Sequence, residues 1–493
     1  MRLRTTAALV AVGLLAGCSS SAPPAPPPPP PPALADELPA KVTADAMVGP
    51  LRALQDIATA NGGSRATGTR GFDASVDYVA KALRDKGFNV ETPEFDRLDP
   101  VSPGNPTLSV GGRSFSVVQA SLLVTTPAGG LTGPVVRPAK PAGCAPADYL
   151  GATLPTGAIA VVDDTACSVV DKQNAALARG AAAVMVVSGG GPNGSPRGLF
   201  DQGYYNGLTV PVAVIGPEVD AVLRKATGPV QLTLDGKTVK VVSRNVIAST
   251  KSGDPHNVVM VGAHLDSVPN SPGINDNGSG VAAVLQTALQ MGSSPAVANA
   301  VRFAFWGGQQ SSLGGALHYV FGLDRDPLND IALYLDVDTI GSRNAGFFTY
   351  DGDQSGPPGQ DGPADAVPPG SAGVERTLAG FLNLAGERPA DMPLSTTTDI
   401  SAFLTAGVPV GGVTTGATQT KTPTQARLWG GTAGQPFDPD YRTPRDTVDN
   451  VNPAALGVMG SAVASAVAAY AESTDGVNGV PPLAKRHRAA VKP

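Results

Sequence analysis

The sequence predicts an α/β protein whose mostly parallel central sheet is flanked by helices and interrupted by a β-rich insert. Two observations favour this fold class. Short apolar runs alternate with amphipathic helical patterns in the first part of the chain and again after position 241, which is typical of a parallel sheet covered on both faces. Between them, the pattern changes to short strands separated by many Gly and Pro turns. We therefore expect a core domain in two segments, 41–125 and 241–475, around an insert at 126–240.

The expected elements follow in chain order. Apolar residues at helical spacing predict two helices between positions 42 and 85, before an extended stretch at 87–90. The insert should hold strands at 158–162, 182–187 and 210–215 and a helix at 171–179. The second core segment should hold strands at 245–248, 258–261, 301–306 and 331–335, with a helix around 281–289. Most of the apolar residues in these elements are expected only to pack in the core.

The N-terminus predicts export and lipidation. Arg2 and Arg4 precede the apolar stretch Ala7 to Leu15, which is too short to span a bilayer and is typical of a secretory signal. The tetrapeptide that ends at Cys18 resembles a bacterial lipobox, so residues 1–18 are interpreted as a lipoprotein signal peptide. An acylated Cys18 would anchor the protein to the extracytoplasmic face of the cell membrane. A plain signal peptide cut elsewhere is the alternative.

The segments next to both ends of the chain are interpreted as unpacked. Residues 19–40 form a tether, because the proline run from Pro23 to Pro32 favours an extended polyproline helix of about 3.1 Å per residue. Residues 476–493 form a basic tail, and its charged part, Lys485 to Arg488, is expected to be solvated.

Composition and cysteine content limit the function further. The 493 residues carry a net charge of −6 with 42% hydrophobic and 15% charged residues, which indicates globular domains and no basic stripe for a nucleic acid. Besides Cys18, the chain has Cys144 and Cys167. Export favours a disulfide between them, while a zinc site is the competing interpretation, with no histidine near either cysteine.

Potential metal ligands follow the predicted strands of the core. His264 ends one strand and Asp338 follows another, while Asp276 lies in a Gly-rich turn that opens a helix. Asp266 is placed to orient the His264 imidazole. Taken singly, a histidine at a strand end is often a hydrogen-bonded core residue and an Asp in such a loop is often a turn former. Together they predict a metal site, because ligands bind at the carboxyl ends of parallel strands.

Five ordered motifs make the prediction more specific. They read Gly-Ala-His-Leu-Asp-Ser-Val, Asn-Asp-Asn-Gly-Ser-Gly, Phe-Ala-Phe-Trp-Gly-Gly-x-x-x-x-Leu-Gly-Gly, Asp-x-Ile-Gly-Ser and Tyr-x-Thr-Pro-x-Asp-Thr. In this order they resemble the aminopeptidase Y and leucyl aminopeptidase family of secreted di-zinc exopeptidases. The resemblance covers about residues 42–471. The insert resembles a protease-associated domain, which matches at Lys172, Ala175, Ala176 and 180–183 and would shape substrate access or bind partners.

The resemblance implies roles for six positions, and three of them depart from the family. His264 and Asp338 would hold one zinc ion, and Asp276 would bridge to a second. The general-base glutamate of the family is replaced by Gln309. The glutamate and histidine that hold the second zinc are replaced by two residues, Gln310 and Arg442.

The three replacements predict a loss of catalysis. An amide cannot accept the proton of an attacking water, which costs about 10²–10⁴-fold in rate, and a guanidinium repels a cation. We expect one zinc ion or none. Arg442 is expected to take the place of the second ion and to pair with Asp276 and Asp338; the alternative is that it turns out to solvent. The other histidines, at 256, 318 and 487, and the nearest glutamates, Glu375 and Glu387, are not placed to substitute.

Two functions remain open at this point. By resemblance, the protein is a zinc metallo-aminopeptidase that removes N-terminal residues from peptides. By its residues, it is a catalytically impaired relative that binds peptides or cell-envelope components. An active enzyme that uses an unrecognised carboxylate is the alternative, whereas a glutaminyl-cyclase-like activity needs the replaced residues. Asp399 either lies near the substrate pocket or caps the following helix.

Overall fold

The computed structural model describes residues 34–475, apart from 152–153, 190–195, 197, 201–202, 313, 359–366 and 395–397, together with 479–486 and 488. The signal peptide, Cys18, the proline run and His487 lie outside the described residues. The end of the predicted tether is wrong, because 34–40 belong to a helix, α1 (Leu34–Lys41). Proline runs no further than Pro32, and Leu38 is fully buried in the core.

The core is an eight-stranded sheet with a parallel centre. Its strands lie in the order β1 (Asn89–Glu91), β13 (Val246–Ser249), β15 (Asn299–Trp306), β14 (Asp254–His264), β16 (Ile331–Val337), β19 (Val410–Thr414), β17 (Phe348–Tyr350) and β18 (Ala390–Met392). The four central strands, β15, β14, β16 and β19, are mutually parallel. Antiparallel pairs join β1, β13 and β15 on one side and β17 to β19 on the other. The predicted α/β sheet is confirmed.

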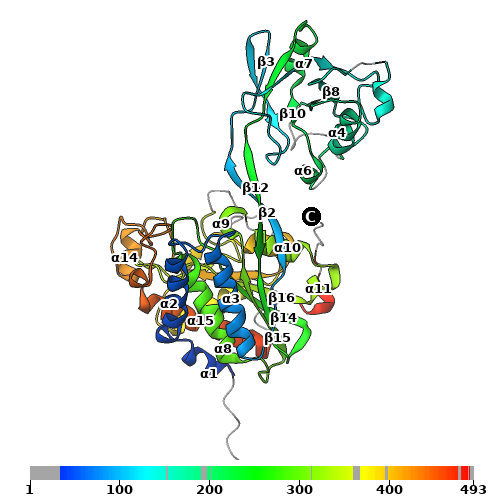
Figure 1. Cartoon of the computed structure of the whole chain (residues 1–493). Coiled ribbons are helices and arrows are strands. Elements are labelled where there is room, and N and C mark those ends of the chain that lie inside the picture. Colours follow the sequence, from blue (N-terminus) through cyan, green and yellow to red (C-terminus); the bar gives the residue numbers. More distant parts are fainter. Residues whose placement is uncertain are drawn as a thin grey trace, which may run out of the picture. The chain divides into compact units, whose positions relative to one another are not determined.

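Helices cover both faces of this sheet, because its strands are apolar on both sides. Val259 and Val261 of β14 face one cluster, and Met260 between them faces the other. The first cluster packs under α1, α2 (Ala44–Ala60), α3 (Arg70–Asp85), α8 (Gly280–Met291), α12 (Ser371–Leu384) and α15 (Pro453–Glu472) (Figure 1). The second packs under α10 (Gly314–Phe321), α11 (Arg325–Asp330) and α13 (Ile400–Thr405). By length and composition α15 could cross a membrane, but most of it is buried in this core.

Short elements complete the core. They are the π-helical turn η2 (Ile274–Ser279), the single turn α9 (Gln309–Ser312), the helix α14 (Pro423–Trp429) and the 3-10 turns η3 (Val448–Asn450) and η5 (Leu483–Lys485). Both η2 and α9 directly follow loops at the carboxyl end of the parallel strands. These turns carry side chains of the candidate site.

The insert has two sheets and is reached through a two-stranded ribbon, β2 (Glu94–Ser102) and β12 (Lys237–Arg244). One sheet has the order β5 (Val118–Gln119), β10 (Val212–Ile215), β9 (Ala183–Val187), β8 (Ile159–Asp163) and β7 (Val135–Val136); the other has β4 (Arg113–Ser116), β3 (Thr107–Val110), β11 (Val230–Thr233) and β6 (Leu131–Gly133). Its helices are α4 (Val169–Leu177), α6 (Tyr204–Gly207), α7 (Pro217–Leu223) and the turn η1 (Pro146–Tyr149).

The insert begins earlier than its predicted boundary at 126. Residues 107–119 form β3, β4 and β5, and β3 and β5 pair with β11 and β10 of the insert. The sequence prediction missed the earlier start of the insert, because the short strands at 107–119 are separated by turns like those that end the first core segment. The insert therefore occupies about residues 107–234.

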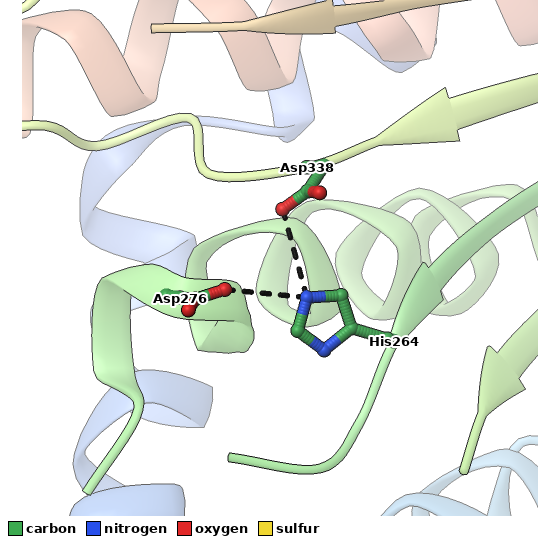
Figure 2. Close-up of side chains that lie close together, drawn as sticks. All are labelled: His264, Asp276 and Asp338. Carbon is green, nitrogen blue, oxygen red and sulfur yellow. Dashed lines mark ion pairs between the residues drawn. The ribbon is translucent and has the colours of Figure 1, made fainter. Parts of the chain in front are cut away.

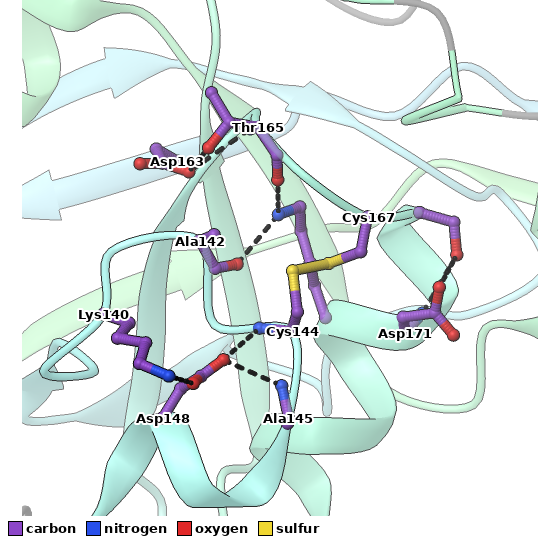
Figure 3. Close-up of a disulfide and its surroundings, with 11 residues drawn as sticks. Lys140, Ala142, Cys144, Ala145, Asp148, Asp163, Thr165, Cys167 and Asp171 are labelled. Carbon is purple, nitrogen blue, oxygen red and sulfur yellow. Dashed lines mark hydrogen bonds and ion pairs between the residues drawn. A yellow bond between two sulfur atoms is a disulfide. The ribbon is translucent and has the colours of Figure 1, made fainter.

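The predicted disulfide joins Cys144 to Cys167, and Figure 3 shows the loops that it connects. Beside it, the fully buried Lys172 donates from Nζ to the carbonyls of Ala142, at 2.8 Å, and Thr165, at 2.6 Å. The disulfide and this lysine together tie the start of α4 to the loop before η1. The zinc interpretation of the two cysteines is wrong.

The prediction of a solvated charge run is wrong at Arg486 and Arg488, whereas Lys485 is exposed as expected. Arg486 and Arg488 are 6% and 5% exposed. Arg486 donates to the carbonyl of Asn329 at 3.0 Å, and Arg488 donates to that of Ile331 at 2.8 Å. A charge run is usually solvated, but these guanidiniums supply donors to carbonyls before and at the start of β16.

Candidate active site

Three predicted metal ligands meet at the carboxyl end of the central strands. His264 is the last residue of β14, Asp338 directly follows β16, and Asp276 lies in η2 ahead of α8. The Nε2 atom of His264 lies 3.3 Å from Oδ1 of Asp276 and 3.6 Å from Oδ1 of Asp338, as Figure 2 shows. One ligand atom from each residue lies within 4.8 Å of the others. An imidazole and two carboxylates that converge in this way fit one zinc ion with a fourth position open.

The imidazole is oriented mainly by a backbone carbonyl. His264 Nδ1 lies 3.0 Å from the carbonyl oxygen of Asp266 and 3.7 Å from its carboxylate. A proton on Nδ1 leaves Nε2 as the atom that faces the two carboxylates. The prediction that the Asp266 side chain orients the ring therefore needs correction. The Asp266 carboxylate instead accepts from the backbone N–H groups of Gln309 and Gln310, each at 3.1 Å.

Gln310 and Arg442 engage the second oxygen of Asp276. Gln310 Nε2 donates to Asp276 Oδ2 at 2.9 Å, and Arg442 Nε lies 3.3 Å from the same oxygen. The predicted pairing of Arg442 with Asp276 is confirmed, and the alternative in which it turns away is wrong. Among the described contacts, Arg442 makes no ion pair with Asp338. The Arg442 guanidinium also lies over the Tyr441 ring, 5.0 Å from its centroid.

These contacts set the protonation of the site. Burial alone would raise the pKa of Asp276, but His264, Arg442 and Gln310 together hold that pKa below its ordinary value. Burial opposes charging of His264, yet Asp276 and Asp338 raise the pKa of the imidazole well above its ordinary value. Asp276 is therefore a carboxylate at neutral pH.

Arg65 holds the two loops of the site together, and sequence reasoning missed it. Its side chain is fully buried, and it donates to the carbonyl oxygens of Pro272, at 2.9 Å, and Gly273, at 2.6 Å. It also donates to the carbonyl of Leu265. Burial lowers the pKa of Arg65 to about 10. One guanidinium thus connects the loop after β14 to the turn that carries Asp276.

Asp446 supports that turn from the other side. Its Oδ1 accepts from the N–H of Asn275 at 2.6 Å and its Oδ2 from the N–H of Asp276 at 3.1 Å. Burial raises the pKa of this carboxyl to about 7. Asp446 stands in the last of the five motifs, so its position was available from the sequence, although its role was not.

Two further carboxyls are buried behind the ligands. The Tyr334 hydroxyl donates to Asp336 Oδ1 at 3.0 Å, and burial followed by the charge of Asp338 raises the pKa of Asp336 to about 8. Asp399 occupies the N-cap position of α13 and is 2% exposed, but its side chain makes no capping hydrogen bond, so the capping interpretation is wrong. Burial and Asp336 raise the pKa of Asp399 well above its ordinary value.

A pocket opens beside the ligands. It has a volume of about 180 Å³, and its lining includes Asp338, Tyr350, Met392, Thr398 and Tyr441. A pocket of this size has room for a single side chain. Its contact with Asp338 connects it directly to the candidate metal site.

The other described histidines and the two glutamates lie elsewhere, as the sequence predicts. His256 is exposed and pairs with Asp330 at 3.0 Å, while His318 stacks on Phe95. Glu375 accepts from the backbone N–H groups of Gly352 and Asp353. Glu387 lines a separate pocket with Trp429. None of these four side chains reaches the ligands of the candidate site.

An imidazole and two carboxylates at the strand ends of a covered parallel sheet define a metallohydrolase-type centre. Comparison with known proteins gives the family. The model of peptidase family M28 matches residues 245–467, and that of the PA domain matches residues 131–221. The probable lipoprotein aminopeptidase LpqL of Mycobacterium tuberculosis is 46% identical over 490 residues, which cover 98% of this chain and 96% of that protein.

A Pseudomonas aeruginosa aminopeptidase is 36% identical over 444 residues, which cover 87% of this chain and 81% of that protein. Among solved structures, the aminopeptidase from Aneurinibacillus sp. strain AM-1 has a TM-score of 0.50 at 22% identity over 90% of this chain and 97% of that one. The latter supports the fold alone. The chain belongs to peptidase family M28 and carries a PA domain.

Proposed function

We propose that this protein is a surface-anchored zinc-binding member of family M28 whose aminopeptidase activity is strongly impaired and whose site binds peptides. The contacts of the Asp276 carboxylate are the main support for this proposal. One of its oxygens faces His264, and the other accepts from Gln310 and pairs with Arg442. Names of relatives support the aminopeptidase origin, since those of Mycobacterium tuberculosis and Pseudomonas aeruginosa are called aminopeptidases.

His264, Asp276 and Asp338 would hold a single zinc ion. Two of the three are almost fully buried, and two carboxylates balance the charge of one divalent cation. A zinc ion bound there would polarise a carbonyl group or a water molecule. The Asp266 carbonyl keeps His264 Nε2 directed at the site. The residues that are present therefore suit one zinc ion.

A second zinc ion does not fit. Gln310 offers a neutral amide whose nitrogen already donates to Asp276, and Arg442 offers a guanidinium. A guanidinium has no lone pair for a metal and remains protonated. Since the cation of Arg442 already pairs with Asp276, it compensates the charge that a second ion would otherwise neutralise. Arg442 therefore already supplies a positive charge where a second ion would have to bind, and that charge repels a further cation.

Loss of the general base explains the proposed impairment. Gln309 begins α9, and its backbone N–H donates to Asp266, so the position is kept although the carboxylate is absent. An amide cannot take a proton from water, and the expected loss is about 10²–10⁴-fold in rate. Without proton transfer, the site can bind a peptide but turns it over poorly.

The surface location rests on Cys18 and on the name of a relative. The lipobox-like tetrapeptide precedes a proline run, and the Mycobacterium tuberculosis relative is named a lipoprotein. Acyl chains on Cys18 would hold the protein at the outer face of the cell membrane. Peptides or cell-envelope components are the partners that such a location supplies.

An active aminopeptidase that uses another carboxylate is the second candidate. Asp399 favours it, because its Oδ1 is buried without a hydrogen-bond partner in the described structure and Thr398 beside it lines the pocket. Burial and Asp336 raise the pKa of Asp399 well above its ordinary value, which disfavours the carboxylate form that a general base needs. An Asp399→Asn variant separates the candidates, since it should abolish any turnover that this residue supports.

Hydrolysis of leucine p-nitroanilide tests the proposal. The zinc-loaded protein should show no turnover above that of a His264→Ala variant, which controls for contaminating peptidases. A Gln309→Glu, Gln310→Glu, Arg442→His triple variant should gain turnover of about 10²-fold or more over that background. Clear turnover by the unaltered protein, lost in Asp399→Asn, would favour the second candidate and overturn the first.

A further inference from the structure

We propose that Arg442 makes this site a receptor for the C-terminal carboxylate of a short peptide in place of an N-terminal ammonium group. The inference rests on the proposed function in one respect, namely that Arg442 remains in the site in place of a second cation. It goes further by reversing the end of the peptide that the site recognises.

The Arg442 guanidinium is available to a ligand. Its side chain is 44% exposed while its partner, Asp276, is 3% exposed. Among the described hydrogen bonds of this guanidinium, Nε alone donates. The Tyr441 ring supports its plane. A planar guanidinium with free N–H groups binds a carboxylate through two parallel hydrogen bonds.

The surroundings disfavour an ammonium group. Positions 309 and 310 carry neutral amides, and Asp276 is already engaged at both oxygens. With zinc bound, its two positive charges and that of Arg442 exceed the two negative charges of Asp276 and Asp338 by one. A net positive ligand shell repels an ammonium group and attracts an anion.

A neutral acceptor near Arg442 suits the peptide group next to such a carboxylate. The Oε1 atom of Gln310 is buried and has no hydrogen-bond partner in the described structure, while Nε2 of the same amide donates to Asp276. A buried acceptor without a donor is costly. The amide N–H of a C-terminal residue would satisfy it without adding charge.

The pocket provides a place for the side chain of the same residue. Tyr441 lines the pocket of about 180 Å³ and also carries the Arg442 guanidinium on its ring. A side chain seated between Tyr350 and Tyr441 would thus bring the carboxylate of its own residue toward Arg442. The geometry points to a peptide whose last residue enters this pocket.

Calorimetry with three leucine dipeptides tests the inference on zinc-loaded full-length protein in detergent. Leu-Leu has both ends free, acetyl-Leu-Leu lacks the ammonium group, and Leu-Leu-amide lacks the carboxylate. We expect the first two to bind equally and the amide to bind about 10–100-fold more weakly, as loss of a charge-assisted pair predicts. Arg442→Gln should remove this discrimination. Arg445→Gln, which alters an exposed arginine paired with Asp440, should retain it.

Tighter binding of the amide than of acetyl-Leu-Leu would overturn the inference, as would binding of none of the three. Zinc content and hydrolysis are measured on the same sample, so that the two proposals fail separately. One zinc ion, no hydrolysis and a preference for the amide would sink the carboxylate receptor alone. Two zinc ions with hydrolysis would sink the proposed function.

Discussion

The two halves of the candidate site differ in side-chain chemistry and share one backbone framework. His264, Asp276 and Asp338 converge as candidate metal ligands, whereas Gln310 and Arg442 present an amide and a cation to the same Asp276. The backbone N–H groups of Gln309 and Gln310 both donate to the Asp266 carboxylate. The backbone framework is therefore common to both halves, although their side chains differ. Buried hydrogen bonds hold the loops in place, so they do not depend on a second metal.

The largest expected effect is the loss of metal from the ligand half. His264→Ala removes the imidazole between the two carboxylates. Substitution of residues that only support a ligand lowers metal affinity about 10–100-fold, and loss of this ligand should lower zinc affinity further. Zinc content by plasma mass spectrometry should drop from one ion per chain to none. His256→Ala is the matched control, because His256 is exposed and distant from the ligands. Retention of zinc by His264→Ala would show that the ion binds elsewhere.

The second-largest effect is expected in the stability of the loops that both halves of the site share. Arg65→Met leaves three backbone carbonyls without their donor, and we expect a loss of about 3–5 kcal/mol in the free energy of unfolding. Denaturant unfolding measures it. Arg84→Met, at an exposed position of α3, should cost less than about 0.5 kcal/mol. Equal losses of unfolding free energy in the two variants would mean that the Arg65 hydrogen bonds do not stabilise the loops.

A smaller effect should be confined to the insert. Cys144→Ser with Cys167→Ser opens the disulfide, which closes a sequence separation of 23 residues, and should cost about 3 kcal/mol in the chain-entropy model. Hydrogen exchange should quicken in β8 and β9 of the insert and remain unchanged in β14 and β16 of the core. Loss of zinc from this variant would contradict the separation between the insert and the site.

The smallest expected effect is a change in zinc affinity on substitution of Arg442. Arg442→Gln removes a positive charge from beside Asp276, so zinc should bind roughly tenfold more tightly to the ligand half. Competition with a chelating dye measures the affinity. Arg343→Gln, which changes an exposed arginine paired with Asp440, should leave it unaltered. Unchanged affinity in Arg442→Gln would place its guanidinium outside the electrostatic reach of the metal.

The sequence predicted the ligand half because simple rules govern it. Ligands gather at the carboxyl ends of parallel strands, and His264 and Asp338 stand at the ends of β14 and β16. The pairing of Arg442 with Asp276 could also be predicted, since a buried carboxylate needs a cation nearby. The hydrophobic periodicity of the sequence predicted the α/β sheet, and the predicted export of the protein favoured the disulfide.

The rest depends on contacts that no local pattern encodes. Arg65 is a single charged residue in a loop, and its partner Leu265 lies 200 positions away. The Asp266 carbonyl orients His264 through a backbone atom, which is the same in every residue type. Docking of Arg486 and Arg488 reverses the usual behaviour of a charge run, because strand ends in the fold supply carbonyls that need donors.

Native mass spectrometry of zinc-titrated protein can show whether Arg442 takes the place of a second zinc ion, because it counts the ions bound to each chain. We expect the unaltered protein to bind one zinc ion and no more. The Gln309→Glu, Gln310→Glu, Arg442→His variant should take up a second. Two ions in the unaltered protein would show that Arg442 does not occupy the position of the second ion.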